Sequence, residues 1–531
     1  MRGYMRILVV VVGMWAGVAQ AKNTLIMAVS SNIGAMNPQG YQGNAMFAQN
    51  SIYEGLVSVD KQGRIIPHLA TSWEISKDGL SYTFSLRKGV RFSNGEAFNA
   101  DVVVLNFQSI LKNRARHSWS GLATHIESVQ KLSEYEIRLT LKAPYSPTLS
   151  ELAVVRPFRF LAPSAFSQGL DLLQYNPTPI GTGAYMLVDT KLGVSDTLEK
   201  NPYYWDKERY NGIYYDEIVL KVIFDPNAKL AALKSGQIHL IYGNDQIPLE
   251  IFKSMQHDVK FATYMSPPLF STSLVLNSSS KQFQVGDSKL NLTFRKALAA
   301  VIDKQRLVGA VYGGLQESAE CFMECKWFKG QQPIDSDKKE LREFLASLMG
   351  GQDVQGQDSH TKIAVQNLRE KGLEILFSGD NPAHRMMAQI IQNDLQQVGI
   401  KVRLRASEPS MYRNALLKGQ FDMAFNDTWG APYEPLSVLY SMLIPSHVDY
   451  AAQSGLENKP MIDKAIRDVI TLNPHSQAFA PSLERLLALL EESGVYVPLT
   501  YQKNKAIAQR KIQGIQMGVV GYEVPFWEMY E

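Results

Sequence analysis

The segment from residue 373 to residue 425 most constrains the fold, because it alternates strand-like and helix-like patterns over a short distance. Short apolar runs indicate buried strands, and apolar side chains three and four positions apart indicate the helices between them. Gly399 is a plausible end of the first helix. The expected elements are, in order, a strand at 373–377, a helix at 386–398, a strand at 400–405, a helix at 411–417 and a strand at 421–425. This β-α-β-α-β series predicts an α/β fold with a parallel sheet.

Two large aromatic rings and a histidine follow the last of these strands. Trp429 and Tyr433 lie in a turn-rich segment, and His447 lies on a loop after Pro445, outside any apolar periodic pattern. Loops at the carboxyl ends of parallel strands often hold ligands, so this stretch is a candidate wall of a cleft around a small molecule. The structural alternative stays open: such rings also cap hydrophobic cores, and a loop histidine is often simply solvated.

Residues 1–21 have the pattern of a secretory signal peptide. Arg2 and Arg6 precede the apolar run 7–18, and Ala19-Gln20-Ala21 is the small-x-small pattern that a signal peptidase requires. The pattern predicts cleavage after Ala21 and export of the mature chain. No later uninterrupted apolar run reaches the roughly 18 residues that a membrane span needs.

The charge balance names no partner. The chain has 54 basic and 51 acidic residues, and removal of the signal peptide takes away two arginines and no acid. Nucleic-acid binding would need a concentrated basic stripe, which the sequence lacks. The only cysteines, Cys321 and Cys325, are expected to close a small disulfide loop in an oxidising compartment, with metal binding by the two thiols as the alternative.

Several short motifs along the mature chain resemble the large periplasmic substrate-binding proteins of the peptide and nickel class, which serve ABC importers. They include a glycine turn at 179–185 and the sequence Asn201-Pro202-Tyr203-Tyr204-Trp205. The others lie at 52–57, 66–73, 100–103, 233–238 and 295–304. The resemblance implies an exported periplasmic protein, a permease of the inner membrane as partner, a monomer, and no enzymatic activity.

The same resemblance implies an α/β fold of the type II periplasmic-binding-protein kind, with two lobes, mixed sheets and a hinge between the lobes. Beyond the signal peptide, the expected divisions are lobe I at 22–270 with an inserted subdomain at about 58–180, lobe II at 271–495, and a return to lobe I at 496–531.

Within that class, four segments resemble the nickel-binding group rather than the peptide binders. They are Arg114-Ala115-Arg116-His117-Ser118-Trp119, Arg156-Pro157-Phe158-Arg159-Phe160, Thr428-Trp429-Gly430-Ala431-Pro432-Tyr433 and Ile444-Pro445-Ser446-His447. By position, the resemblance implies a ligand pocket made by Met46, Arg116, Trp119, Arg156, Trp429, Tyr433 and His447. It implies that His447 is the single direct metal ligand and that the two arginines hold carboxylates.

This combination is chemically coherent for nickel carried as a complex. Ni2+ takes imidazole nitrogens and carboxylate oxygens in tetragonal or octahedral geometry, so one protein histidine leaves most of its coordination positions open. A small chelator such as L-histidine would supply the remaining donors and would present carboxylates to the protein. The planar guanidinium of arginine suits such carboxylates, because it can bind both oxygens at once.

Each assignment has a structural alternative. Arg114 and Arg116 follow a predicted helix whose C-terminal end favours cations without any ligand. Arg156 could pair with a protein carboxylate, and Met46 could be core packing. His117 is expected at the surface rather than in the metal site.

The chain also departs from the nickel group's pattern, which puts the size and charge of the complex in doubt. Asn426 and Asp427 replace a His-Arg pair, Leu436 replaces a histidine, and Tyr522 replaces a small hydroxyl residue of the pocket.

Two other functions compete with nickel transport. The same fold could bind a dipeptide, an oligopeptide or another metallophore. A secreted metallohydrolase is the more distant alternative, because the sequence lacks a His-Glu-x-x-His motif, a Gly-x-Ser-x-Gly elbow and a phosphate loop.

Overall fold

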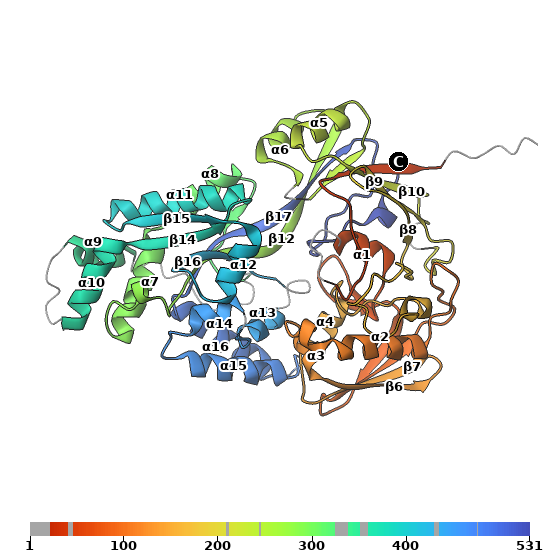
Figure 1. Ribbon diagram of the computed structural model, residues 1–531, viewed down its shortest axis with the longest axis horizontal. Coiled ribbons are helices and arrows are strands. Elements are labelled where there is room, and N and C mark those ends of the chain that lie inside the picture. Colours follow the sequence, from red (N-terminus) through yellow and green to blue (C-terminus); the bar gives the residue numbers. More distant parts are fainter. Residues whose placement is uncertain are drawn as a thin grey trace, which may run out of the picture.

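The computed structural model describes residues 22–40, 46–208, 212–243, 246–323, 338–350, 359–429, 435–445, 447–474 and 476–531. Two lobes lie side by side, and two long antiparallel strands run from one to the other (Figure 1). These strands are β12 (Phe261–Leu276) and β17 (Tyr496–Gln509). The two-lobed α/β fold with a mixed sheet, as expected from the sequence, is therefore confirmed.

The main sheet extends through both lobes because β12 and β17 belong to it along their whole length. Its strand order is β15-β14-β16-β12-β17-β11-β1-β10-β9-β8, with β13 also paired to β17. On the lobe I side the strands are β1 (Thr24–Val29), β8 (Tyr185–Lys191), β9 (Ser195–Lys200), β10 (Glu217–Val222) and β11 (Leu240–Tyr242). β1 is parallel to β10 and β11, whereas β9 is antiparallel to β10 and to β8.

One helix of this half begins at a clear sequence signal. Asp225 accepts a hydrogen bond from the Ala228 amide, and Pro226 follows it, so the two residues start α5. The helices are α1 (Met46–Ile52), α5 (Pro226–Lys234) and α6 (Leu249–Met255), with a short 3-10 turn, η8 (Phe526–Glu528), near the C-terminus. The C-terminal tail packs back here, since Phe526 lies edge-on to Phe47 of α1.

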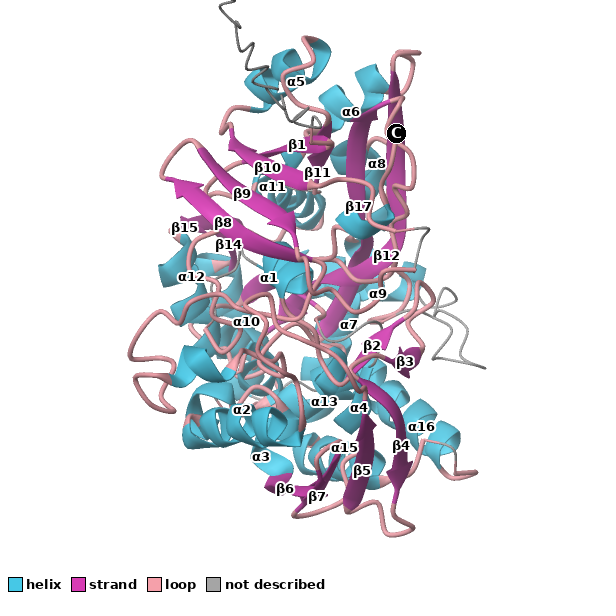
Figure 2. Ribbon diagram, turned by 90° about the vertical axis from the view of Figure 1, so that its right-hand side faces the viewer, coloured by secondary structure: helices cyan, strands magenta, loops and turns pink. Residues whose placement is uncertain are grey.

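A separate four-stranded antiparallel sheet lies at the far end of lobe I (Figure 2). Its order is β4-β5-β7-β6, from β4 (Ala70–Ile75), β5 (Ser81–Leu86), β6 (Ile126–Ser133) and β7 (Glu136–Leu141). Alternate residues of β5 are buried, as a strand with one face on a core requires. Associated with it are the hairpin β2 (Val57–Val59) and β3 (Ile65–Pro67), the helices α2 (Ala100–Lys112), α3 (Gly121–His125) and α4 (Thr148–Ala153), and the 3-10 turns η2 (Arg114–His117) and η3 (Pro163–Phe166).

The lobe II side of the main sheet contains the β-α-β-α-β series that the sequence predicts. β14 (Leu373–Ser378) is parallel to both β15 (Val402–Ser407) and β16 (Met423–Asp427). The connecting helices are α11 (Pro382–Gln397) and α12 (Pro409–Leu417). This part of the fold prediction is confirmed.

The element boundaries differ from the predicted ones where a cap decides them. α11 begins at Pro382, four residues before the predicted start at Met386, because Asn381 caps it through the His384 amide. Gly399 adopts a left-handed backbone, with φ of 86°, directly after the helix, which ends the helix as predicted.

Further helices surround this half of the sheet, and a small strand joins β17. They are α7 (Ser288–Val301), α8 (Lys304–Tyr312), β13 (Glu317–Ser318), α9 (Lys338–Gly350), α10 (Ser359–Lys371), α13 (Pro435–Ser441), α14 (Val448–Gln453), α15 (Lys459–Thr471) and α16 (Phe479–Glu492), with a 3-10 turn η6 (Lys281–Phe283). Among the described residues, none of the helices is both long enough and apolar enough to cross a bilayer.

The pairing of β12 with β17 is irregular in the middle of the two strands. Its register shifts between Met265 and Pro268 and again between Pro268 and Phe270. Pro267 and Pro268 have no backbone N–H to donate, so the ladder of hydrogen bonds is interrupted there. On one side of the interruption, β17 pairs with β11 of lobe I. On the other side, β12 pairs with β16 of lobe II, so the interruption lies between the two lobes.

The lobes also touch below β12 and β17 in Figure 1, where α13 faces α3 and α4. The Tyr440 hydroxyl of α13 is 3.0 Å from Thr124 Oγ1 of α3, and its ring lies edge-on to Tyr145 at 5.7 Å between centroids. Ser437 Oγ, also on α13, is 3.3 Å from Oε1 of the buried Glu151. Hydrogen bonds and aromatic packing between these residues therefore join the two lobes.

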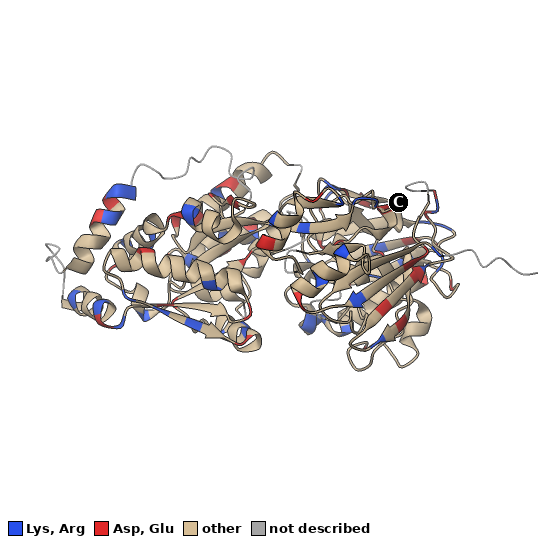
Figure 3. Ribbon diagram, turned by 90° about the horizontal axis from the view of Figure 1, so that it is seen from above, with Lys and Arg blue, Asp and Glu red and all other residues tan. Residues whose placement is uncertain are grey.

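Two sequence predictions fall partly outside the described residues. The predicted signal peptide, residues 1–21, lies outside them, and so does Cys325. Cys321 is disulfide-bonded. In the view of Figure 3, Lys and Arg are interspersed with Asp and Glu along the ribbon of both lobes.

Candidate functional site

Three of the predicted pocket residues meet between the lobes. The indole rings of Trp119, from lobe I, and Trp429, from lobe II, pack edge to face with 5.4 Å between their centroids. The His447 ring lies 6.1 Å from the Trp429 ring. Both tryptophans are half-buried, and the His447 side chain is 21% exposed. The site therefore combines two indole rings and one imidazole, contributed by both lobes.

Trp429 is placed by the strand that precedes it. β16 ends at Asp427, and Thr428 then forms two hydrogen bonds with Ser271 of β12. The Thr428 amide donates to the Ser271 carbonyl at 2.9 Å, and the Ser271 amide donates to Thr428 Oγ1 at 2.9 Å. Trp429 therefore leaves the carboxyl end of a buried strand at a fixed point, which is where ligands meet parallel sheets.

Trp119 is held by buried residues on both sides of it in the chain. His117 is fully buried at the end of η2, and Ser120 caps α3 through the Ala123 amide. Glu151, which accepts a hydrogen bond from the Leu122 amide at 2.9 Å, also bonds Ser120. The prediction that His117 lies at the surface is wrong, because η2 turns its imidazole into the protein. Burial, and then the charge of Arg116, lower the pKa of His117 to about 4, so the ring is neutral at pH 7.

His447 opens α14 and is oriented by a buried carboxylate. Its Nδ1 lies 3.1 Å from Oδ2 of Asp449, whose side chain is 1% exposed. The sequence analysis did not identify Asp449 as a functional residue. The only signal was its position two residues after His447.

Arg156 is 6% exposed and lies in lobe I, where its Nη1 donates to the Gly40 carbonyl at 3.1 Å. The Arg156–Pro157 peptide bond is cis. Tyr522, one of the departures from the nickel pattern, interacts electrostatically with Arg159 and Arg156. Burial raises the pKa of Tyr522, which keeps its phenol neutral beside these cations.

The remaining predicted residues are placed less directly. Met46 is the first residue of α1 and is half-buried. The same helix contacts the segment 156–160 through Asn50, whose Oδ1 accepts a hydrogen bond of 3.3 Å from Arg159 Nη2. Arg116 is exposed on η2, three residues before Trp119. Tyr433 lies outside the described residues.

The other departures have identifiable roles in the structure. Asn426 Nδ2 donates to both carboxylate oxygens of Asp449, at 3.2 and 3.4 Å. Asp427 accepts a hydrogen bond of 2.6 Å from Thr272 Oγ1. Leu436 is buried in α13. Asn426 thus belongs to the surroundings of His447, whereas Leu436 is packed in the core.

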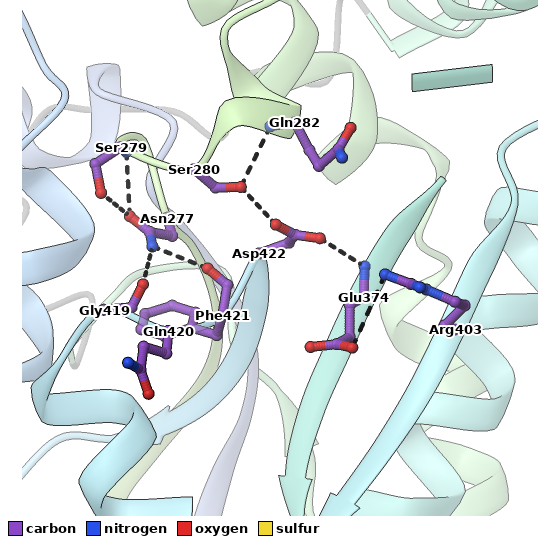
Figure 4. A pocket seen from close by; sticks show the side chains of 10 residues that line it. All are labelled: Asn277, Ser279, Ser280, Gln282, Glu374, Arg403, Gly419, Gln420, Phe421 and Asp422. Carbon is purple, nitrogen blue, oxygen red and sulfur yellow. Dashed lines mark hydrogen bonds and ion pairs between the residues drawn. The ribbon is translucent and has the colours of Figure 1, made fainter. Parts of the chain in front are cut away.

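A polar cavity of about 330 Å³ lies at the opposite end of the lobe II strands from Trp429 (Figure 4). Its polar groups bond one another: Asp422 accepts from Ser280 and from the Glu374 amide, and Asn277 donates to the Phe421 carbonyl. It lies at the amino ends of β14 and β16, away from Trp429. Among the described residues, no group of three His, Cys, Asp or Glu side chains is arranged to hold a metal ion.

Comparison with known proteins decides the family. Residues 64–450 match the family described as bacterial extracellular solute-binding proteins, family 5 Middle, which is more than half of the chain. The chain belongs to this family. Its members are substrate-binding proteins of ABC importers.

Individual relatives share the fold over nearly their whole length. The chain is 35% identical, over 96% of its own length and 94% of the relative's, to the nickel-binding periplasmic protein of Escherichia coli. A solved structure of NikA from Brucella suis in complex with Fe(III)-EDTA superposes with a TM-score of 0.81 at 35% identity, covering 96% of this chain and 99% of that one. NikZ from Campylobacter jejuni, solved with Ni(L-His), superposes with a TM-score of 0.75 at 22% identity, over 96% and 100% of the two chains, which shows the shared fold.

Proposed function

We propose that this protein captures nickel in the periplasm as a complex with a small chelator such as L-histidine and delivers it to the inner-membrane permease of an ABC importer. The observation that carries the proposal is the meeting of His447 with Trp119 and Trp429 between the lobes. One imidazole beside two aromatic faces suits a metal complex whose other donors come from a small organic molecule. The relatives described above as nickel-binding support the choice of metal.

The chemistry of the residues fits such a cargo. An imidazole nitrogen is a good ligand for Ni2+, which needs four to six donors in all. The carboxylates of the chelator would leave negative charge facing the protein. Arg156, buried in lobe I, and Arg116, exposed on η2 three residues before Trp119, are the cations we assign to that charge. Partly buried arginine–carboxylate pairs are charge-assisted and stronger than hydrogen bonds between neutral groups.

The remaining parts of the proposal concern export and assembly. We propose cleavage after Ala21, a monomer in the periplasm, and transfer of the complex without chemical change. N-terminal sequencing of the mature protein should therefore begin at Lys22, and sedimentation should give the mass of one chain.

The experiment that tests the function is analysis of protein purified from its native periplasm without added metal. Native mass spectrometry together with metal analysis should find nickel and an organic molecule bearing carboxylates in the same protein complex. A bound peptide without metal would instead show that the fold serves peptide uptake.

A further inference from the structure

Asp449 is a buried carboxylate in the first turn of α14. Its side chain is 1% exposed, and its Oδ2 lies 3.1 Å from His447 Nδ1. Buried carboxylates are costly unless other groups satisfy them. The Asp449 carboxylate has hydrogen-bond partners in the loop before α14 and in β16.

Side chains from two other places in the fold hydrogen-bond the carboxylate. His447 lies before α14, and Asn426, on β16, donates to both oxygens at 3.2 and 3.4 Å. Because β16 pairs with β12, the Asn426 amide links the carboxylate beside His447 to the main sheet.

A carboxylate in this position determines how the imidazole can act. An ionised carboxylate only accepts hydrogen bonds, so His447 must carry a proton on Nδ1 to bond it. A neutral imidazole has a single N–H, so that tautomer leaves the lone pair on Nε2. The same hydrogen bond fixes the rotation of the ring. Metal-binding histidines commonly require such a partner, and loss of the partner weakens metal binding.

We propose that Asp449 is the positioning residue of the nickel site, holding His447 in the Nδ1–H tautomer with Nε2 available to the metal of the incoming complex. The proposal rests on the proposed function, and it extends the site to a residue that itself touches no ligand. Asn426 contributes to this arrangement. The nickel group has a basic residue at this position, whereas this chain has a neutral amide that donates to Asp449 and adds no positive charge beside the metal.

The test replaces Asp449 by an isosteric amide, Asp449→Asn. The asparagine keeps one oxygen acceptor and gains an NH2 group, which must face either the Asn426 amide or His447 Nδ1, so it holds the Nδ1–H tautomer less firmly. Binding of Ni2+ with L-histidine, measured by calorimetry, should weaken by roughly 10- to 100-fold, the range found when such partners of metal-binding histidines are removed. The matched control is Asp422→Asn, a carboxylate on the other end of β16 that bonds Ser280 and the Glu374 amide. The control should bind as tightly as the parent protein.

A second measurement reads the orientation without any ligand. In protein labelled with 15N-histidine, the His447 signal, assigned by its loss in His447→Ala, should report a protonated Nδ1 and an unprotonated Nε2. Asp449→Asn should change that pattern and Asp422→Asn should not. A protonated Nε2 in the parent protein, or an affinity of Asp449→Asn within twofold of the parent, would overturn the proposal. If the parent protein binds no nickel complex at all, the proposed function is wrong, while the nitrogen signals still decide whether Asp449 sets the tautomer.

Discussion

The single side chain on which the account depends most is His447. It lies at the start of α14, partly exposed, so its loss removes a metal ligand and little buried apolar surface. We expect His447→Ala to weaken binding of Ni2+ with L-histidine by about tenfold or more, which corresponds to about 1.4 kcal/mol or more. Calorimetry measures the affinity, and thermal unfolding should show little change in stability.

A matched control for that substitution is His257→Ala, an exposed histidine in the loop before β12. The control should leave both affinity and stability unchanged. If His447→Ala binds the complex as tightly as the control while remaining folded, His447 does not coordinate the metal.

Glu523, next to Tyr522, should make stability depend on pH. Burial, followed by the nearby Glu528 carboxylate, raises the pKa of Glu523 from 4.5 to about 7. A raised pKa in the folded state favours the protonated form, so this contribution to stability is complete below about pH 4.5 and is lost as the pH rises through 7. We expect Glu523→Gln to unfold at the same temperature as the parent protein near pH 4.5 and at a higher temperature at pH 8. A difference that does not change with pH would show that Glu523 titrates normally.

At the scale of secondary-structure elements, the glycine turn at 179–185 fixes the end of α1. A Cβ on Gly181 would lie 2.0 Å from the Ile52 carbonyl oxygen and 2.7 Å from Tyr53 Cδ1. Because the nearest atom is a backbone oxygen, which cannot rotate out of the way as a side chain can, Gly181→Ala must displace α1 or the turn. We expect a loss of about 1–3 kcal/mol or more in the free energy of unfolding, measured by denaturant titration.

Gly309→Ala is the matched control for this turn. Gly309 lies in α8, and nothing lies within 4 Å of the position of an added Cβ. Glycine inside a helix costs roughly 0.5–1 kcal/mol relative to alanine, so this variant should be slightly more stable. Equal behaviour of the two variants would contradict the packing described for Gly181.

The elements themselves were largely predictable from the sequence, whereas the contacts within the site were not. The strands and helices between 373 and 427 follow from apolar spacing, which depends only on local periodicity. The start of α11 was missed because a cap by Asn381, and not an apolar residue, begins it.

The site shows where local patterns stop being informative. Trp119 and Trp429 could be assigned to one pocket through the family resemblance, but their contact depends on how two lobes pack. The burial of His117 depends on a 3-10 turn that apolar spacing does not reveal. The pairing of Asp449 with His447 could not be predicted, because it depends on where α14 begins, and side chains two positions apart meet only in some backbone conformations.

At the scale of the whole molecule, the contact between α13 and lobe I should favour a closed form, in which the two lobes touch, over an open form in which they are apart. Tyr440 is buried there, bonds Thr124 at 3.0 Å and packs against His125 and Tyr145. We expect Tyr440→Ala to increase the radius of gyration of the free protein in small-angle scattering, since the lobes would separate about the interrupted part of β12 and β17. Affinity for the nickel complex should fall as well, because binding must then restore the closed form.

Tyr530→Ala, which changes a half-exposed tyrosine near the C-terminus, controls for the loss of an aromatic side chain. Scattering curves of Tyr440→Ala and Tyr530→Ala that superimpose on that of the parent protein would show that the α13 contact does not hold the lobes together.

The central claim is that the site between the two lobes binds a nickel complex and not the bare ion. Calorimetric titration of the ligand-free protein with Ni2+, first in chelator-free buffer and then with excess L-histidine, tests it most directly. The account predicts weak binding of Ni2+ alone and tight binding with L-histidine, because His447 supplies one donor and the arginines bind the chelator's carboxylates. Tight binding of Ni2+ in chelator-free buffer, or no binding in either buffer, would contradict it.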